Sequence, residues 1–242
     1  MSKFSFVNKK NIQNNNFFLD QDESHHLINV LRLKINSNIW LTDGEGGTYY
    51  SKVDTFTHKN IVEGSIVEYY TNQNELKYHV HLGIPIIKNS RMKIAVEKSV
   101  ESGIKELTPL YLDRSIKSNV SVKKMTSVML SGVKQSMRSI IPKINPVARL
   151  EDWYDIEALN IAASIESKDT LTLFKDEIFS AVNSNKKISI LIGPEGGFSS
   201  KEKEFIYDNK FLKVSLAKAV LRTETAVVSI LSILNELMAQ YE

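Results

Sequence analysis

Hydrophobic positions divide the chain into a β-rich first part and a longer part in which strand and helix patterns alternate. Three strand-like runs with a period near two precede residue 72, over 38–42, 48–53 and 60–70. Asp43-Gly44 separates the first two runs and is a strong hairpin signal. Helical spacing in this part occurs at 25–32. The pattern predicts a small β-rich domain with one helix over residues 1–72.

A polar stretch at 71–75 follows and is the best candidate for a linker. Short apolar runs then predict strands over 78–84, 107–112, 160–165, 188–192 and 211–215. Helical spacing predicts helices over 90–102, 120–138, 178–182 and 224–240. Because the two patterns alternate, residues 73–242 are predicted to form an α/β domain.

Two loops stand out within this α/β pattern. The apolar run 188–192 ends in Gly193-Pro194-Glu195-Gly196-Gly197, a turn in which glycines let a ligand approach bare backbone. Ser199 precedes Glu202 by three residues, which is a capping box and predicts the start of a helix. The second loop, 216–223, precedes the last helix. Ligands on α/β sheets bind at the carboxyl ends of strands, so both loops are expected to line a site.

The glycine turn does not match the common nucleotide-binding patterns. It lacks the G-x-x-x-x-G-K-[ST] spacing, because Lys201 follows Ser199 and Ser200 instead of preceding a hydroxyl residue. The G-x-G-x-x-G pattern is also absent. These differences argue against a phosphate loop of either type.

Composition adds few constraints. The chain has 242 residues, 42% hydrophobic and 24% charged, which is ordinary for a globular protein. The absence of cysteine excludes disulfides and thiolate metal sites. No apolar run reaches about 18 residues, and the N-terminus lacks the apolar core of a signal peptide. We therefore expect a soluble, cytoplasmic protein.

Charge is distributed unevenly although the net charge is only +3. Residues 73–150 carry 14 basic and 5 acidic side chains, a net charge of +9. The segments before and after carry net charges of −1 and −5. This basic block is either a phosphate-binding surface or a solvated lysine face, and charge alone leaves both possibilities open.

The two loops together carry a specific resemblance. GPEGGFS at 193–199 and LRTETA at 221–226 resemble the signature of the bacterial RsmE family. The resemblance implies methylation of N3 of one uridine in the decoding region of 16S ribosomal RNA, in the small ribosomal subunit. It also implies S-adenosylmethionine as the cofactor and no metal.

The resemblance implies a fold as well. The family belongs to the SPOUT superfamily, whose α/β domain has a parallel sheet with helices on both faces and a C-terminal trefoil knot. A PUA-like, RNA-binding β-barrel is implied for residues 1–72 by the HHLxxVLR pattern that begins at His25 and by the strand and Asp43-Gly44 after it. The methyltransferase domain would span 73–242. Proteins of this superfamily form homodimers.

The expected cofactor site combines the two loops with the end of a neighbouring strand. Its expected residues are Ile165, Ile192, Gly193, Gly196, Gly197, Leu216, Ala217, Leu221 and Thr223. The second loop departs from the usual family form LGxRxLRTETA, because Ala217 replaces a glycine and Ala219 an arginine. The first change adds a methyl group where backbone meets ligand, and the second removes a possible RNA contact.

Arg222 and Glu195 are the expected catalytic residues. A guanidinium beside the uracil could stabilise charge on its carbonyl oxygens when N3 is deprotonated. Glu195 and Glu224 are the carboxylates nearest the loops, and either could accept the proton. Structural roles remain open for all three residues: Arg222 could pair with Glu195 or Glu224, Glu195 could tie the two loops together, and Glu224 could complement the helix dipole.

The resemblance also implies RNA contacts. The expected RNA-binding residues are Arg32, Lys88, Arg114, Gln135 and Arg138. The family pattern E-Q-x-x-R is incomplete here, because Lys134 stands in place of the glutamate. Arg138 could bind phosphate or the target base through its planar donor fork, or it could be an ordinary surface arginine.

Other interpretations remain. A non-catalytic RNA-binding protein could keep this fold, and a methyltransferase of the same superfamily could act on another RNA. The adjacent His25 and His26 point apart on a helix, so structural or RNA-contact roles are favoured over a metal pair. His79 and His81 share one face of a strand and are interpreted as structural. The last helix is apolar on most sides, which predicts a second cover and hence a dimer.

Overall fold

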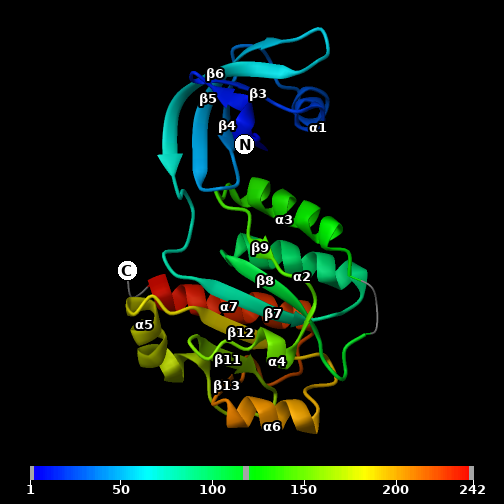
Figure 1. Ribbon diagram of the computed structural model, residues 1–242, viewed down its shortest axis with the longest axis vertical. Coiled ribbons are helices and arrows are strands. Elements are labelled where there is room, and N and C mark those ends of the chain that lie inside the picture. Colours follow the sequence, from blue (N-terminus) through cyan, green and yellow to red (C-terminus); the bar gives the residue numbers. More distant parts are fainter. Residues whose placement is uncertain (1–2, 117–119, 240–242) are drawn as a thin grey trace. The chain divides into compact units, whose positions relative to one another are not determined.

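In a computed structural model, which describes residues 3–116 and 120–239, the chain divides into two compact units (Figure 1). The first unit combines residues 1–75 with 130–141, and the second combines 76–129 with 142–242. The second half of the long helix α3 (Val122–Ser136) therefore belongs with the first unit, although it lies far along the chain.

The first unit is built on a mixed six-stranded sheet in the order β1-β4-β5-β6-β3-β2. These strands are β1 (Phe4–Phe6), β4 (Asn38–Thr42), β5 (Gly47–Phe56), β6 (Val62–Thr71), β3 (Asn16–Phe18) and β2 (Ile12–Gln13). The predicted hairpin joins β4 to β5. Its turn is stabilised by Asp43, whose Oδ1 accepts the backbone N–H groups of Glu45 at 2.8 Å and Gly47 at 2.9 Å. The core of the first unit lies on one face of the sheet and includes Leu27, Ile39, Leu41 and Val53.

Short helical segments accompany this sheet. They are η1 (Lys9–Asn11), α1 (Gln21–His25) and η2 (His26–Val30), a single π-type turn that continues α1. The Asp20 side chain caps α1 by accepting the Glu23 N–H at 2.9 Å. The predicted helix at 25–32 thus begins earlier than expected, because the capping carboxylate lies at Asp20.

The second unit contains a parallel sheet in the order β10-β8-β7-β12-β11-β13, with β9 paired to β8. The strands are β7 (Val80–Pro85), β8 (Glu106–Tyr111), β9 (Lys143–Ile144), β10 (Ala148–Arg149), β11 (Leu159–Ala163), β12 (Ile188–Ile192) and β13 (Leu212–Val214). The helices around it are α2 (Asn89–Glu101), α4 (Leu150–Trp153), η3 (Leu171–Phe174), α5 (Lys175–Asn183), α6 (Ser200–Asp208) and α7 (Thr223–Ala239). Every residue of β12 is buried, as expected for a central strand of a parallel sheet covered on both faces.

The last helix, α7, finds its cover within its own chain. Ile230 and Leu234 are fully buried, and α2 packs along α7. Asn235 links them, because its Nδ2 donates to the Ser102 carbonyl at 3.0 Å. The second cover predicted for this helix is therefore supplied by its own chain, and the expectation that a partner must supply it was wrong. Although α7 is strongly apolar, no helix among the described residues is both long and apolar enough to cross a membrane.

Candidate active site

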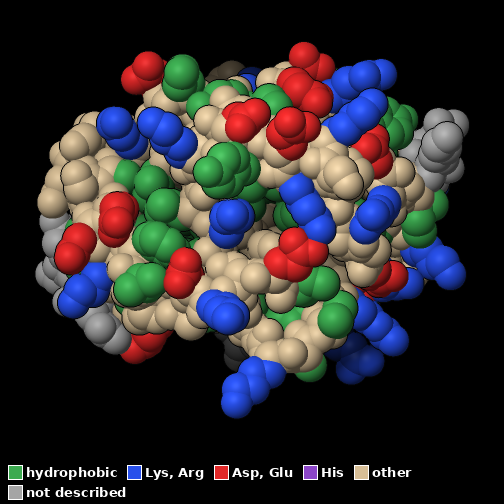
Figure 2. Space-filling view, turned by 90° about the horizontal axis from the view of Figure 1, so that it is seen from below, with side chains coloured by type: hydrophobic (Ala, Val, Ile, Leu, Met, Phe, Trp, Pro, Cys, Tyr) green, Lys and Arg blue, Asp and Glu red, His purple; other side chains and the backbone are tan. Residues whose placement is uncertain are grey.

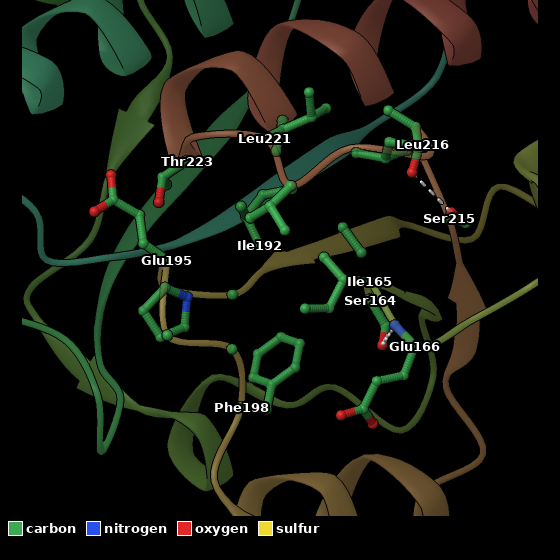
Figure 3. A pocket seen from close by; sticks show the side chains of 18 of the residues that line it. Ser164, Ile165, Glu166, Ile192, Glu195, Phe198, Ser215, Leu216, Leu221 and Thr223 are labelled. Carbon is green, nitrogen blue, oxygen red and sulfur yellow. Dashed lines mark hydrogen bonds between the residues drawn. The ribbon is translucent and has the colours of Figure 1, made fainter.

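A cavity lies at the carboxyl ends of β11, β12 and β13 (Figure 3). Three loops surround it: residues 163–166, residues 193–198 and residues 215–223. Its volume is about 780 Å³ when the space open to solvent is included. All nine residues expected to bind the cofactor line this cavity.

The glycine loop has its shape for local reasons. A Cβ on Gly193 would lie 3.0 Å from Cζ of the buried Phe198, so a side chain there would require the ring to shift. Gly197 has φ of +71° and donates its N–H to the Pro194 carbonyl at 2.8 Å. A Cβ on Gly197 would meet nothing within 4 Å. This turn therefore presents bare backbone to the open cavity.

The capping box predicted at Ser199 is confirmed and extends beyond its own helix. Ser199 Oγ accepts the Glu202 N–H at 3.3 Å, and Glu202 Oε2 accepts the Ser199 N–H at 2.7 Å. The other Glu202 oxygen accepts the Asp113 N–H at 2.8 Å. Ser199 Oγ donates to Asp113 Oδ2 at 2.5 Å. These bonds fix the glycine loop to the turn after β8.

Two arginines hold the glycine loop in place. Arg114 Nη1 donates to the Gly196 carbonyl at 2.6 Å, and Arg91 forms an ion pair with Glu195. Glu195 thus ties the glycine loop to the first turn of α2. It does not tie this loop to the second loop, as the sequence had suggested. Sequence reasoning missed Arg91. Its position just after β7, close to the expected Lys88, was the available signal.

Arg222 lies at the start of α7 and is exposed, outside the lining of the cavity. In the described part of the chain its guanidinium makes no hydrogen bond or ion pair, so the alternative pairing with Glu195 or Glu224 is not observed. Thr223 lines the cavity, and its buried Oγ1 finds no hydrogen-bond partner among the described residues. The buried Oε2 of Glu224 also has no hydrogen-bond partner among the described residues.

The inner wall of the cavity is largely apolar. Figure 3 shows the Phe198 ring pointing into the cavity toward Ile165, with Ile192 and Leu221 above it. Several further lining residues were not singled out individually from the sequence, although most lie in the segments expected to surround the site: Ser164, Glu166, Pro194, Phe198, Lys203, Ser215 and Val220. Among them Lys203 and Glu166 form an ion pair. Ala217 and Ala219, the two departures from the family form, both line the cavity.

The residues expected to bind RNA have different surroundings. Lys88 and Arg114 are exposed and follow β7 and β8, at the same edge of the sheet as the cavity. In the first unit, Arg32 and Gln135 are exposed. Arg138, in contrast, is only 2% exposed.

Arg138 forms a buried ion pair. Its Nη2 and Nε donate to Glu75 at 2.5 and 3.2 Å, and Glu75 Oε1 also accepts the backbone N–H groups of Ser139 and Ile140. The structure therefore gives Arg138 an internal role that the sequence did not reveal.

The basic block is partly neutralised by such pairs. Arg91, Lys134, Arg138 and Lys143 each contact a carboxylate. On the face of Figure 2, which is seen from below Figure 1, Lys and Arg side chains are interspersed with Asp and Glu.

No group of three or more His, Asp and Glu residues with metal-binding geometry occurs within residues 3–116 and 120–239.

Comparison with known proteins agrees with this architecture. A family model described as an RNA methyltransferase domain matches residues 74–235, and one described as an RNA methyltransferase PUA domain matches residues 19–53. The chain is 30% identical to the ribosomal RNA small subunit methyltransferase E of Mesomycoplasma hyopneumoniae, over 94% of this chain and 96% of that protein. It is 28% identical to the protein of the same name from Buchnera aphidicola, over 93% of this chain and 90% of that protein.

A solved structure shares the fold of the whole chain. The ribosomal RNA small subunit methyltransferase E of Neisseria gonorrhoeae, crystallised with bound S-adenosyl methionine, superposes with a TM-score of 0.81 at 26% identity. The match covers 98% of both chains. The expected fold class, a SPOUT-type α/β domain with a PUA-like N-terminal domain, is confirmed. The chain belongs to the RNA methyltransferase family and, within it, to the ribosomal RNA small subunit methyltransferase E proteins.

Proposed function

We propose that this protein transfers the methyl group of S-adenosylmethionine to N3 of a uridine in the decoding region of 16S ribosomal RNA. The family match and the names of the relatives support an enzyme acting on small-subunit ribosomal RNA. The Neisseria structure supports the cofactor, because that protein holds it and shares the fold over nearly its whole length. Such an enzyme works in the cytoplasm, where ribosomal subunits are assembled.

The cavity at the carboxyl ends of β11, β12 and β13 is the observation that carries this proposal. Its residues fit an adenosyl group: bare backbone at Gly197, apolar side chains at Ile165 and Leu221, and the unpartnered hydroxyl of Thr223. Backbone N–H and C=O groups of the two loops would bind the adenine edge. When bound, S-adenosylmethionine supplies a methyl group on a sulfonium leaving group, so neither a metal nor a protein nucleophile is needed.

Arg222 is the residue best placed to act on the RNA base. It is exposed, adjoins the cavity residues Leu221 and Thr223, and has a guanidinium without a partner in the described chain. Uracil N3 must lose its proton as it is methylated, and negative charge then spreads onto O2 and O4. A guanidinium beside those oxygens stabilises that charge. Glu195 is held by Arg91, which supports a role in positioning the glycine loop ahead of a role as proton acceptor.

The test measures 3-methyluridine in 16S ribosomal RNA by mass spectrometry of nucleosides. A strain that lacks the gene should lose this nucleoside, and the wild-type gene should restore it. Arg222→Ala should fail to restore it while keeping wild-type affinity for S-adenosylmethionine in calorimetry. Undiminished 3-methyluridine in the deletion strain would refute the proposal. Purified enzyme offered naked 16S RNA and small-subunit particles in parallel will show which form is the substrate.

We also propose that the protein is a homodimer, as the superfamily resemblance implies. A charged substitution on α7 can test this proposal only at an exposed position. Ile230 and Leu234 are buried within one chain, so a charge there would unfold the protein whether or not it dimerises. Val228, which is 37% exposed on α7, is the better probe. Light scattering should give twice the chain mass for the wild type and a lower mass for Val228→Lys. A wild-type mass of 27.5 kDa at all concentrations would exclude the dimer.

A further inference from the structure

Three aromatic side chains form a row across the outer face of the first unit's sheet. Trp40 lies in β4, Tyr50 in β5 and Tyr70 in β6. The ring centroid of Trp40 lies 5.0 Å from that of Tyr50 and 5.6 Å from that of Tyr70. We call these three residues the aromatic row; their strands lie side by side in Figure 1.

The aromatic row faces away from the core. Side chains alternate between the two faces of a strand, and the neighbours Ile39, Leu41 and Tyr49 belong to the buried core. Tyr70 is 38% exposed, and Trp40 and Tyr50 are half-buried. A group of large aromatic rings on the solvent side of a sheet is informative, because burial does not account for it.

Hydrogen bonds hold the rings of the aromatic row in place. Asn38 Nδ2 donates to the Tyr50 hydroxyl at 2.7 Å, and the Tyr70 hydroxyl donates to Glu68. Lys52 lies directly opposite Asn38 in the register of β4 and β5 and is exposed on the same face. The site thus combines fixed aromatic faces with a nearby cation.

We propose that the aromatic row binds unpaired bases of single-stranded RNA by stacking. This inference rests on the proposed action on RNA and assigns a base-binding surface to the first unit. Aromatic side chains on a sheet are a common platform for unstacked bases, and each stacked base contributes about 1–3 kcal/mol. Lys52 supplies attraction to the phosphate backbone. The matched PUA segment, residues 19–53, contains Trp40, Tyr50 and Lys52.

Trp40 offers a direct measurement of this contact. The chain has two tryptophans, and the other, Trp153, is only 4% exposed. The probe is an oligouridine of about ten nucleotides, within the usual site sizes for single strands. Oligouridine should quench the emission of the wild-type protein, whereas an abasic oligonucleotide of equal length and charge should not. The quenching should be absent in Trp40→Phe.

Affinity provides the second measurement. Trp40→Leu and Tyr70→Leu keep apolar packing but remove an aromatic face, so affinity for oligouridine should fall between about five-fold and about a hundred-fold. Tyr69→Leu is the matched control: Tyr69 neighbours Tyr70 on β6, is 57% exposed and points to the opposite face, so affinity should not change. If Trp40→Leu does not fold, Tyr70→Leu and the wild-type quenching still decide.

The outcome separates this inference from the proposed function. Wild-type protein that methylates ribosomal RNA, yet shows neither quenching nor weaker binding in the two variants, would overturn the stacking surface and leave the methyltransferase intact. The aromatic row would then serve only cross-strand packing within the sheet. Quenching by oligouridine in a protein that does not methylate ribosomal RNA would support the stacking surface and refute the proposed methyltransferase function.

Discussion

Two buried carboxylates, Glu75 and Glu106, show how single residues hold each unit together. The Glu75 side chain is 3% exposed and is paired with Arg138, and its Oε1 also accepts two backbone N–H groups. Glu75 is the last residue of the predicted linker at 71–75, and Arg138 follows α3. The pair therefore fastens residues 130–141 to the first unit.

Removing one charge of this pair should be costly. Glu75→Gln leaves the Arg138 guanidinium buried without its carboxylate, so the free energy of unfolding should fall by roughly 3–5 kcal/mol. Urea titration monitored by circular dichroism measures this. Glu45→Gln is the control, since the Glu45–Lys9 pair is 64% exposed on both sides and its loss should cost far less. Equal losses in the two variants would contradict the assignment.

Glu106 belongs to a polar cluster in the second unit, with His81 and Trp153. The Trp153 indole N–H donates to His81 Nε2 at 3.0 Å, so that nitrogen carries no proton and the imidazole is neutral. Burial lowers the pKa of His81 to about 4, against the upward pull of Glu106. Burial alone would raise the pKa of Glu106, but the Asn145 hydrogen bond and nearby cations lower it to about 2.

These pKa values predict that acid destabilises the protein in two stages. As pH falls from about 6.5 to about 4, the unfolded chain binds a proton at His81 that the folded chain does not, so stability is lost. Between about pH 4.5 and 2 the same argument applies to Glu106. Urea titrations at pH 7 and pH 5 should differ by about 2 kcal/mol on account of His81. His81→Gln should remove most of that difference and leave the loss below pH 4.5.

At the scale of elements, the glycine loop after β12 is held by side chains of neighbouring segments and leaves backbone open to the cavity. It is fixed by Arg91, Arg114 and Asp113, which come from the segments after β7 and β8. At Gly197 it presents bare backbone to the cavity. These contacts keep the loop in a shape that can receive a ligand with little ordering cost.

The bare backbone at Gly197 and the ion pair at Glu195 should contribute unequally to cofactor binding. Gly197→Val places a β-branched side chain at φ of +71° and its methyl groups in the cavity, so affinity for S-adenosylmethionine should fall at least about ten-fold. Arg91→Met removes a partly exposed ion pair and should cost at most about five-fold. Calorimetry ranks the two variants, and the reverse order would show that the ion pair dominates.

At the scale of the whole molecule, the sheet order decides which cations can act together. In a parallel sheet all carboxyl ends meet at one edge, so Lys88 after β7 and Arg114 after β8 lie at the same edge as the cavity. Lys186 and Lys210 precede β12 and β13 and lie at the opposite edge. Net charge alone does not distinguish these groups.

Salt dependence of RNA binding should distinguish the two edges. Lys88→Gln combined with Arg114→Gln should weaken RNA binding and reduce the slope of log K against log salt by about 1.4 to 1.8, if each cation contacts one phosphate. Lys186→Gln combined with Lys210→Gln removes the same charge from the opposite edge and should leave the slope unchanged. Filter-binding titrations measure both. Equal slopes in all three proteins would assign Lys88 and Arg114 to an ordinary solvated surface.

The sequence by itself determined the elements and the two loops that form the cavity. Apolar periodicity located β7, β8, β11, β12 and β13, since that signal lies within a few neighbouring residues, but it missed the two-residue strands β9 and β10. The capping box of Ser199 and Glu202 predicted the start of α6, and the motif at 193–199 identified the glycine loop. These features are local, so they can be recognised without knowing what packs against them.

Only the tertiary structure decided the partners. Arg91 pairs with Glu195 across 104 positions, because β12 inserts beside β7 and brings their loops together. Arg138 becomes buried because residues 130–141 join the first unit, and α7 is covered because α2 packs along it. Such contacts depend on strand order and on which surfaces meet. Periodicity records only that a face must be buried, and leaves open what buries it.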